Sequence, residues 1–169
     1  LEGVANQGHV LMPITYTNTG NANEDGWNLV GNPYPSTINW NSPNWKKNNM
    51  ANAIQILNAN TGQYATYVNG ASTLGGSPLI ASQQAFWVYA SGAGASLTAT
   101  EGVKSSTDQL FLKSQSISPG MQISLEGDKM LDECVIRHVN GANEVFDVDF
   151  DAYKLYSNSN VYPNISILN

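Results

Sequence analysis

The strongest constraint on the fold is a two-residue alternation of side chains, interrupted every few residues by Gly, Asn or Pro. The segment Ala85–Ala90 reads AFWVYA, so Phe86 and Val88 fall on one face of an extended chain. Trp87 and Tyr89 fall on the opposite face, because successive side chains of a strand point to opposite sides. An amphipathic helix would instead repeat its apolar residues every three or four positions. This pattern indicates an all-β chain.

The alternation predicts strands along most of the chain. Two of them, at 54–57 and 63–68, form a hairpin around the turn residues 58–62. The other expected strands lie at 10–17, 27–30, 85–90, 96–100, 110–113, 121–126, 133–139, 145–150, 153–156 and 164–168. Short strands at this spacing, joined by Gly, Asn and Pro, are typical of β-sandwiches. We therefore expect an antiparallel β-sandwich of jelly-roll type.

Helical periodicity is nearly absent. Only the region around 44–57 places Trp45, Met50 and Ile54 where they can share one helical face. Its asparagines are poor helix formers and limit a helix to one or two turns. At most one short helix, near 44–52, is expected.

Length and composition favour one folded module. The 169 residues suit a single domain, and the charged fraction of 12% is roughly half the usual share. We expect one module over 1–169, with the polar connector 101–109 as its one internal boundary. The chain begins without methionine or a signal-peptide pattern, so we interpret it as an internal piece of a longer multidomain protein.

The charge and the reactive residues argue against several function classes. The net charge is −6, which gives no basic surface for nucleic acid, and no run approaches the ~20 apolar residues that span a bilayer. Cys134 is the single cysteine and is expected to be a small buried hydrophobe. The two histidines, His9 and His138, belong to no recognisable nucleophile motif. We therefore expect a protein that is not an enzyme and requires no cofactor.

An acidic run near the C-terminus offers one candidate metal site. On a strand, Asp147, Asp149 and Asp151 would line one face and repel one another unless solvated or bound to a cation. Calcium is the natural candidate because it prefers oxygen ligands, although the spacing is not that of an EF-hand. The alternatives are a solvated acidic turn, or Asp151 paired with Arg137 or Lys154.

The aromatic residues offer a candidate carbohydrate site, because sugar rings stack on exposed aromatic faces while Asn and Gln satisfy their hydroxyls. The competing interpretation is a sandwich core. The core interpretation is favoured for Trp27 and Trp87, which lie in alternating segments. The residues that remain candidates for a polysaccharide or surface glycan are Tyr34, Trp40, Trp45, Tyr64 and Tyr67.

Four blocks of sequence carry a family resemblance. Residues 26–40 read GWNLVGNPYPSTINW, and the blocks at 53–64, 80–90 and 146–155 follow in the same order. The first closely resembles the signature GWNLVGNPYPSxIDW of β-rich modules in large secreted proteins of Bacteroidota. Such proteins are commonly exported by type IX secretion, and the module lies upstream of a C-terminal sorting domain. The resemblance implies an extracellular or cell-surface location.

The chain departs from this pattern at two positions. Ala85 stands where the similar modules have a glycine, which questions close backbone packing there. Asn39 stands where the signature has aspartate, which removes one charge from the turn. Similar proteins also continue past Leu168 with further strands, so a strand from another chain is a candidate partner.

These observations lead to a ranked set of functions. The first is a non-catalytic extracellular β-sandwich module that acts as an adhesive or spacer unit beside other domains of the same polypeptide, with some affinity for carbohydrate. The second is a dedicated carbohydrate-binding module of a polysaccharide-degrading enzyme. The third is a structural subunit whose sheet is completed by a partner strand.

Overall fold

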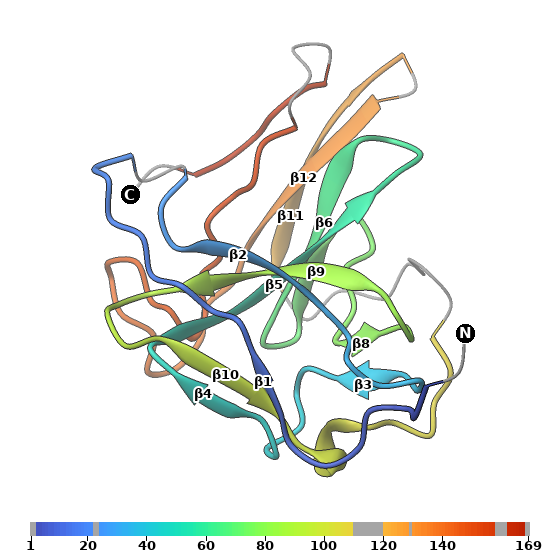
Figure 1. Cartoon of the computed structure of the whole chain (residues 1–169). Coiled ribbons are helices and arrows are strands. Elements are labelled where there is room, and N and C mark those ends of the chain that lie inside the picture. Colours follow the sequence, from blue (N-terminus) through green and yellow to red (C-terminus); the bar gives the residue numbers. More distant parts are fainter. Residues whose placement is uncertain (1–2, 22–23, 110–119, 129, 158–161, 168–169) are drawn as a thin grey trace. The chain divides into compact units, whose positions relative to one another are not determined.

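The computed structural model describes residues 3–21, 24–109, 120–128, 130–157 and 162–167 (Figure 1). Within these ranges the regular structure consists of antiparallel strands and one 3-10 turn, η1 (Glu101–Val103). The prediction of an all-β antiparallel fold is confirmed, and the sheets are consistent with a β-sandwich. The chain falls into two compact units. Unit 1 comprises Leu1–Ala51 and Pro78–Phe111, and unit 2 comprises Asn52–Ser77 and Leu112–Asn169.

Unit 1 contains a three-stranded sheet and two further strand pairs. The sheet has the order β1-β10-β4, and the pairs are β2 with β9 and β3 with β8. The strands are β1 (Val10–Met12), β2 (Trp27–Gly31), β3 (Ile38–Asn39), β4 (Lys46–Asn48), β8 (Leu79–Ile80), β9 (Ala85–Ala90) and β10 (Ser96–Ala99). In the β2–β9 ladder Trp27 lies opposite Tyr89, and Leu29 lies opposite Trp87.

Unit 2 contains an antiparallel meander and a separate hairpin. The meander consists of β5 (Met50–Asn58), whose first two residues belong to unit 1, β6 (Gln63–Val68) and β7 (Ala71–Thr73). The hairpin consists of β11 (Met121–Gly127) and β12 (Met130–Ile136), paired with Ser124 opposite Glu133.

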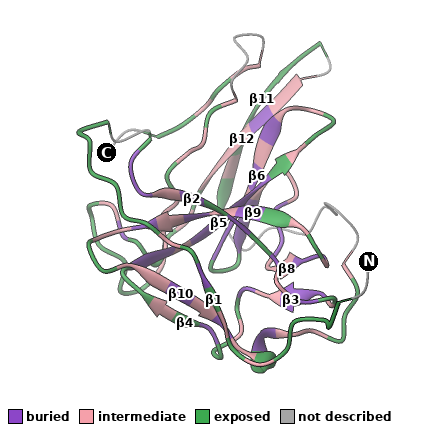
Figure 2. Ribbon diagram, viewed as in Figure 1, coloured by how far each residue is buried: buried purple, intermediate pink, exposed green. Residues whose placement is uncertain are grey.

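The core of unit 1 is formed by the inward positions of the alternating strands, and Figure 2 shows buried residues along these strands. Val30 of β2 and Phe86 and Val88 of β9 are 5%, 0% and 0% exposed. Ile38 of β3 and Leu97 of β10 are also fully buried. Burying such side chains stabilises a fold by roughly 1.5–3 kcal/mol each relative to full exposure. This burial fixes the orientation of β2 and β9, because the side chains on one face of each strand must point into the interior.

The core of unit 2 is smaller. Ala53, Val68 and Ala71 form a buried cluster, and Val135 and Ala152 pack against it. Small side chains at these positions allow the meander and the later segments of the chain to approach closely.

The strongly alternating segments match the structure. The strands β6 and β9 occupy the expected residues, and β2, β5, β10, β11 and β12 overlap their expected ranges. The region 44–52 contains no helix, since Lys46–Asn48 and Met50–Asn58 are strands. The expected strand 110–113 lies outside the described residues.

Three expected strands are wrong. Residues 145–150 form no strand and end in a turn at 148–150, and the described residues of 153–156 and 164–168 form no ladder strand. Alternation is present in all three, but a strand also requires a neighbouring backbone with matching register. At 145–151 the chain instead turns back on itself, with the amides of Phe150 and Asp151 donating to the carbonyl of Asp147.

Candidate functional site

The turn after β2 is organised by one side chain. The Asn32 amide nitrogen donates to the carbonyls of Ser36 and Ala81 at 2.8 and 2.9 Å, and its oxygen accepts from the amide of Tyr34 at 3.0 Å. Asn32 is 6% exposed. Pro33 and Pro35 lack amide donors, so the side chain of Asn32 supplies the hydrogen bonds that hold the turn.

Tyr34 lies at the centre of this turn and points inward. It is 1% exposed, and its hydroxyl lies 2.6 Å from the carbonyl oxygen of Gly8 and 3.1 Å from that of Ala99. The Lys104 ammonium lies 4.5 Å from the centre of its ring. Burial, and secondarily the charge of Glu101, raise the pKa of the Tyr34 hydroxyl. Tyr34 therefore connects three separate segments of unit 1.

Trp40 and Trp45 form a buried aromatic pair. They are 2% and 8% exposed, and their ring centres lie 5.0 Å apart. The indole nitrogen of Trp45 donates to the carbonyl of Asn39 at 2.9 Å. Trp40 also meets Phe86 edge to face at 5.9 Å, and the ammonium of Lys47 lies 3.6 Å from the centre of its ring. The pair is part of the core of unit 1.

The hypothesis that Tyr34, Trp40 and Trp45 present exposed rings to a sugar is therefore wrong. Tyr34, Trp40 and Trp45 are all buried, because large rings stabilise the fold most when their area is removed from water. The two remaining sugar candidates lie in unit 2. Tyr67 is 6% exposed and accepts a hydrogen bond from the amide of Gly70, whereas Tyr64 is half-buried. Of the five candidates, four are therefore buried, and Tyr64 alone is partly exposed.

A different set of aromatic residues lies on the surface of unit 1. The outward positions of the β2–β9 ladder carry Trp27, Leu29, Trp87 and Tyr89, which we call the outer aromatic face. Leu29 is 55% exposed and the other three are half-buried. The core interpretation of Trp27 and Trp87 is wrong, because Asn28, Val30, Phe86 and Val88 occupy the inward positions instead.

The two departures from the signature have little structural cost. The Asn39 side-chain oxygen accepts from the amide of Asn41 at 2.9 Å, a bond that aspartate would also make. Ala85 is exposed at the start of β9 opposite Gly31, so its methyl group faces solvent. The methyl group of Ala85 therefore does not obstruct the packing of the backbone at this position.

The acidic residues near the C-terminus order a turn. Asp147 is 7% exposed, and its carboxylate accepts from the amide of Asn143 at 3.1 Å and from that of Asp149 at 2.9 Å. The carboxylate of Asp151 accepts from the amide of Asp147 at 2.8 Å, and that of Asp149 accepts from the Asn52 side chain at 2.9 Å. The three carboxylates therefore bind protein donors. Across the described ranges, no three His, Cys, Asp or Glu side chains are grouped so that they could hold a metal ion.

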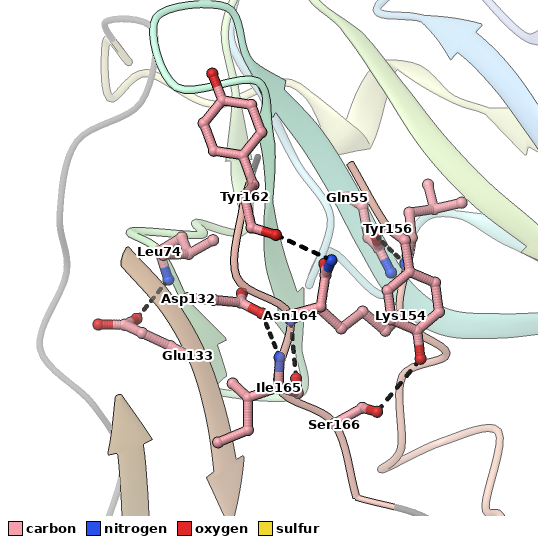
Figure 3. Close-up of polar contacts among 11 residues, drawn as sticks. Gln55, Leu74, Asp132, Glu133, Lys154, Tyr156, Tyr162, Asn164, Ile165 and Ser166 are labelled. Atoms are coloured by element: carbon pink, nitrogen blue, oxygen red, sulfur yellow. Dashed lines mark hydrogen bonds and ion pairs between the residues drawn. The ribbon is translucent and has the colours of Figure 1, made fainter. Parts of the chain in front are cut away.

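A polar cluster in unit 2 holds the C-terminal segments to the hairpin (Figure 3). The carboxylate of Asp132, which is 2% exposed, pairs with the Lys154 ammonium and accepts from the amide of Ile165. Gln55 is 1% exposed, donates to the carbonyl of Tyr153 and accepts from the amide of Leu155. The anticipated pairing of Lys154 with Asp151 is wrong, because Lys154 pairs with Asp132. Sequence alone gave no sign of this cluster, since its bonded partners lie 11 to 100 positions apart.

Two carboxylates of unit 1 are stabilised in their charged form. The backbone amide of Thr19 is the main cause that lowers the pKa of Asp25, opposed by desolvation and helped by the Thr19 hydroxyl and the amide of Gly20. The side chain of Lys104 is the main cause that lowers the pKa of Glu101, helped by the amide of Gly8. Both carboxylates hold loop backbone in place.

The remaining reactive side chains of the described ranges lie at or near the surface. His9 and His138 are exposed, and Cys134 is a free, half-buried thiol. No family model, curated protein or solved structure matches this chain. Within the described ranges, no helical segment has the length and apolar character that crossing a bilayer requires.

Proposed function

We propose that this chain is a non-catalytic, extracellular β-sandwich module of a secreted or cell-surface protein, and that it acts as an adhesive or spacer unit. The observation that carries the proposal is the burial of Asn32, Tyr34 and Trp40, which lie in the signature segment 26–40, and of the nearby Trp45. These four residues make the turn and core of unit 1. This part of the signature therefore serves folding and offers no exposed site.

The composition supports the same proposal. An extracellular spacer needs a stable β fold with uncharged polar loops, and this chain has few charges and a fold of antiparallel strands. The resemblance of residues 26–40 to modules of type IX-exported Bacteroidota proteins supports the extracellular location. The function as a dedicated carbohydrate-binding module loses the support of Tyr34, Trp40 and Trp45, which are buried.

The test of the proposal is a turnover measurement. The purified chain is incubated with soluble polysaccharides, aryl esters and casein, and the products are followed by chromatography. We expect no product above that of buffer. Turnover that copurifies with the chain and disappears after substitution of one side chain would show an enzyme and contradict the proposal.

The hairpin of unit 2 favours a second candidate, a subunit that extends its sheet with a strand of a second copy. Met121, Ile123 and Leu125 share one face of β11 and are 55%, 37% and 43% exposed. Among the described residues β11 pairs with β12 alone, which leaves its other edge open. Two antiparallel copies of β11 that cross at Ser124 would place Ile123 opposite Leu125. Open apolar edges are templates for such pairing.

A further inference from the structure

The outer aromatic face is an apolar surface on the β2–β9 ladder of unit 1. It concentrates two tryptophans, one tyrosine and one leucine on two neighbouring strands, and the leucine is more than half exposed. The opposite faces of the same strands already supply the core, with Val30, Phe86 and Val88 buried. The outer residues are therefore not required to fill that core.

The register of the ladder makes these side chains one continuous patch. Trp27 lies opposite Tyr89 and Leu29 lies opposite Trp87. Neighbouring strands are about 4.8 Å apart, and residues two positions apart on one strand are about 6.8 Å apart. Trp27 and Tyr89 meet edge to face, with ring centres 5.3 Å apart and planes at 77°. This contact fixes both rings, so a ligand would meet a rigid surface that is about the size of one or two sugar rings.

Charge and size distinguish among the classes of ligand that such a patch could bind. Neither β2 nor β9 contains a charged residue, and the chain carries a net charge of −6. Single-stranded nucleic acid also stacks on aromatic rings, but it requires basic groups for its phosphates. A stable protein interface needs about 20–30 residues a side, many more than this patch offers. A neutral sugar chain fits both the charge and the size.

We propose that the outer aromatic face binds a neutral glycan, with Trp87 and Leu29 as its central contacts and Trp27 and Tyr89 as its rigid border. The proposal rests on the extracellular role stated above and names the ligand of that role. It gives the module an adhesive function that a spacer alone would lack.

The experiment is affinity electrophoresis of the whole chain in gels that contain soluble xylan, mixed-linkage β-glucan, mannan or dextran, followed by calorimetry for each glycan that retards it. Two variants remove the site, Trp87→Ala and Leu29→Arg. The second changes a surface side chain and leaves the core intact. The matched control is Leu11→Ala, because Leu11 is 71% exposed on β1 of the same unit. Circular dichroism verifies that each variant is folded.

The proposal predicts retardation by at least one neutral glycan. Leu29→Arg and Trp87→Ala should each weaken that binding by about tenfold or more, and Leu11→Ala should leave it unchanged. Absence of retardation by every glycan would overturn the site but leave the non-catalytic role intact. Binding that survives both variants would also overturn the site. Self-association that Leu29→Arg abolishes, without glycan binding, would assign the face to protein contacts instead.

Discussion

At the scale of single residues, Tyr34 shows how an aromatic side chain within an apparent ligand platform can serve the fold. Its ring is buried, and its hydroxyl lies within hydrogen-bond distance of the carbonyls of Gly8 and Ala99. The hydroxyl has one proton and donates it to one of these two carbonyls at a time, and this hydrogen bond stabilises the native state because the hydroxyl itself is buried away from water.

The substitution Tyr34→Phe tests this role. It keeps the ring and removes the hydroxyl, so the free energy of unfolding should fall by about 1–2 kcal/mol. Urea denaturation followed by tryptophan fluorescence measures the change. A free energy of unfolding equal to that of the unaltered chain would mean that the hydroxyl faces water.

Asp25 predicts a pH dependence of stability. Its pKa is lowered in the folded chain, mainly by the amide of Thr19, so the folded state favours the carboxylate. The stabilisation is present above the ordinary pKa of about 3.9 and is lost as the pH falls through the lowered folded value. Thermal unfolding followed from about pH 7 to about pH 2 should show this loss.

The control for Asp25 is the variant Asp25→Asn, which has no carboxylate to titrate. Its melting temperature should depend less steeply on pH in the acidic range, and Glu101→Gln separates the contribution of the other carboxylate with a lowered pKa. Identical acid profiles of Asp25→Asn and the unaltered chain would show that Asp25 makes no such contribution.

At the scale of elements, the two glycines that flank or end β2 differ in their tolerance of substitution. The fold requires one of them and tolerates replacement of the other. Gly26, just before the strand, has φ of +77°, and a Cβ there would lie 2.6 Å from the carbonyl oxygen of Ala90. Gly31, at the end of the strand, has no atom within 4 Å of such a Cβ. Gly26→Ala should lower the free energy of unfolding by more than about 1–3 kcal/mol, because strain and collision add.

Gly31→Ala is the matched control, and its effect should stay within about 0.5 kcal/mol. Chemical denaturation of both variants under the same conditions provides the comparison. Equal effects would mean that the path of the chain into β2 differs from the one described here.

The hairpin β11–β12 predicts self-association. If two copies pair along β11, the unaltered chain should show a dimer in sedimentation velocity at high concentration, and Ile123→Lys should shift it to monomer. Ile123 is 37% exposed, so the lysine is tolerated in the monomer. Leu57→Lys, on an exposed position of β5, is the control and should leave the dimer intact. A chain that is monomeric at every concentration would exclude the second candidate function.

The elements also show which features of the fold the sequence predicts and which it does not. AFWVYA at 85–90 identifies the strand β9 and the two sets of residues that share a face. It does not identify which set points inward, because that depends on neighbouring strands distant in sequence. The short strands β3 and β8, of two residues each, carry no alternation to detect. The expected strand at 145–150 is wrong because the hydrogen bonds of Asp147 replace a strand partner, and an acidic turn, which was one of the alternatives for this run, forms instead.

At the scale of the whole molecule, the aromatic residues divide into two populations with opposite roles. Trp40 and Trp45 belong to the core, whereas Trp27 and Trp87 belong to the surface of the β2–β9 ladder. Sequence reasoning favoured the core for Trp27 and Trp87 and kept Trp40 and Trp45 as candidates for an exposed site, because composition predicts that rings are present but not where they are packed. The proposed function and the proposed glycan face both depend on this division.

Oxidation of the native chain by N-bromosuccinimide, with the modified positions located by peptide mass spectrometry, tests that division most directly. All four tryptophans are measured in one sample, and the chain unfolded in urea supplies the reference rate of each. Trp27 and Trp87 should react early in the folded chain, while Trp40 and Trp45 should stay protected until it unfolds. Early oxidation of Trp40 and Trp45, with Trp27 and Trp87 protected, would contradict the division into core and surface pairs.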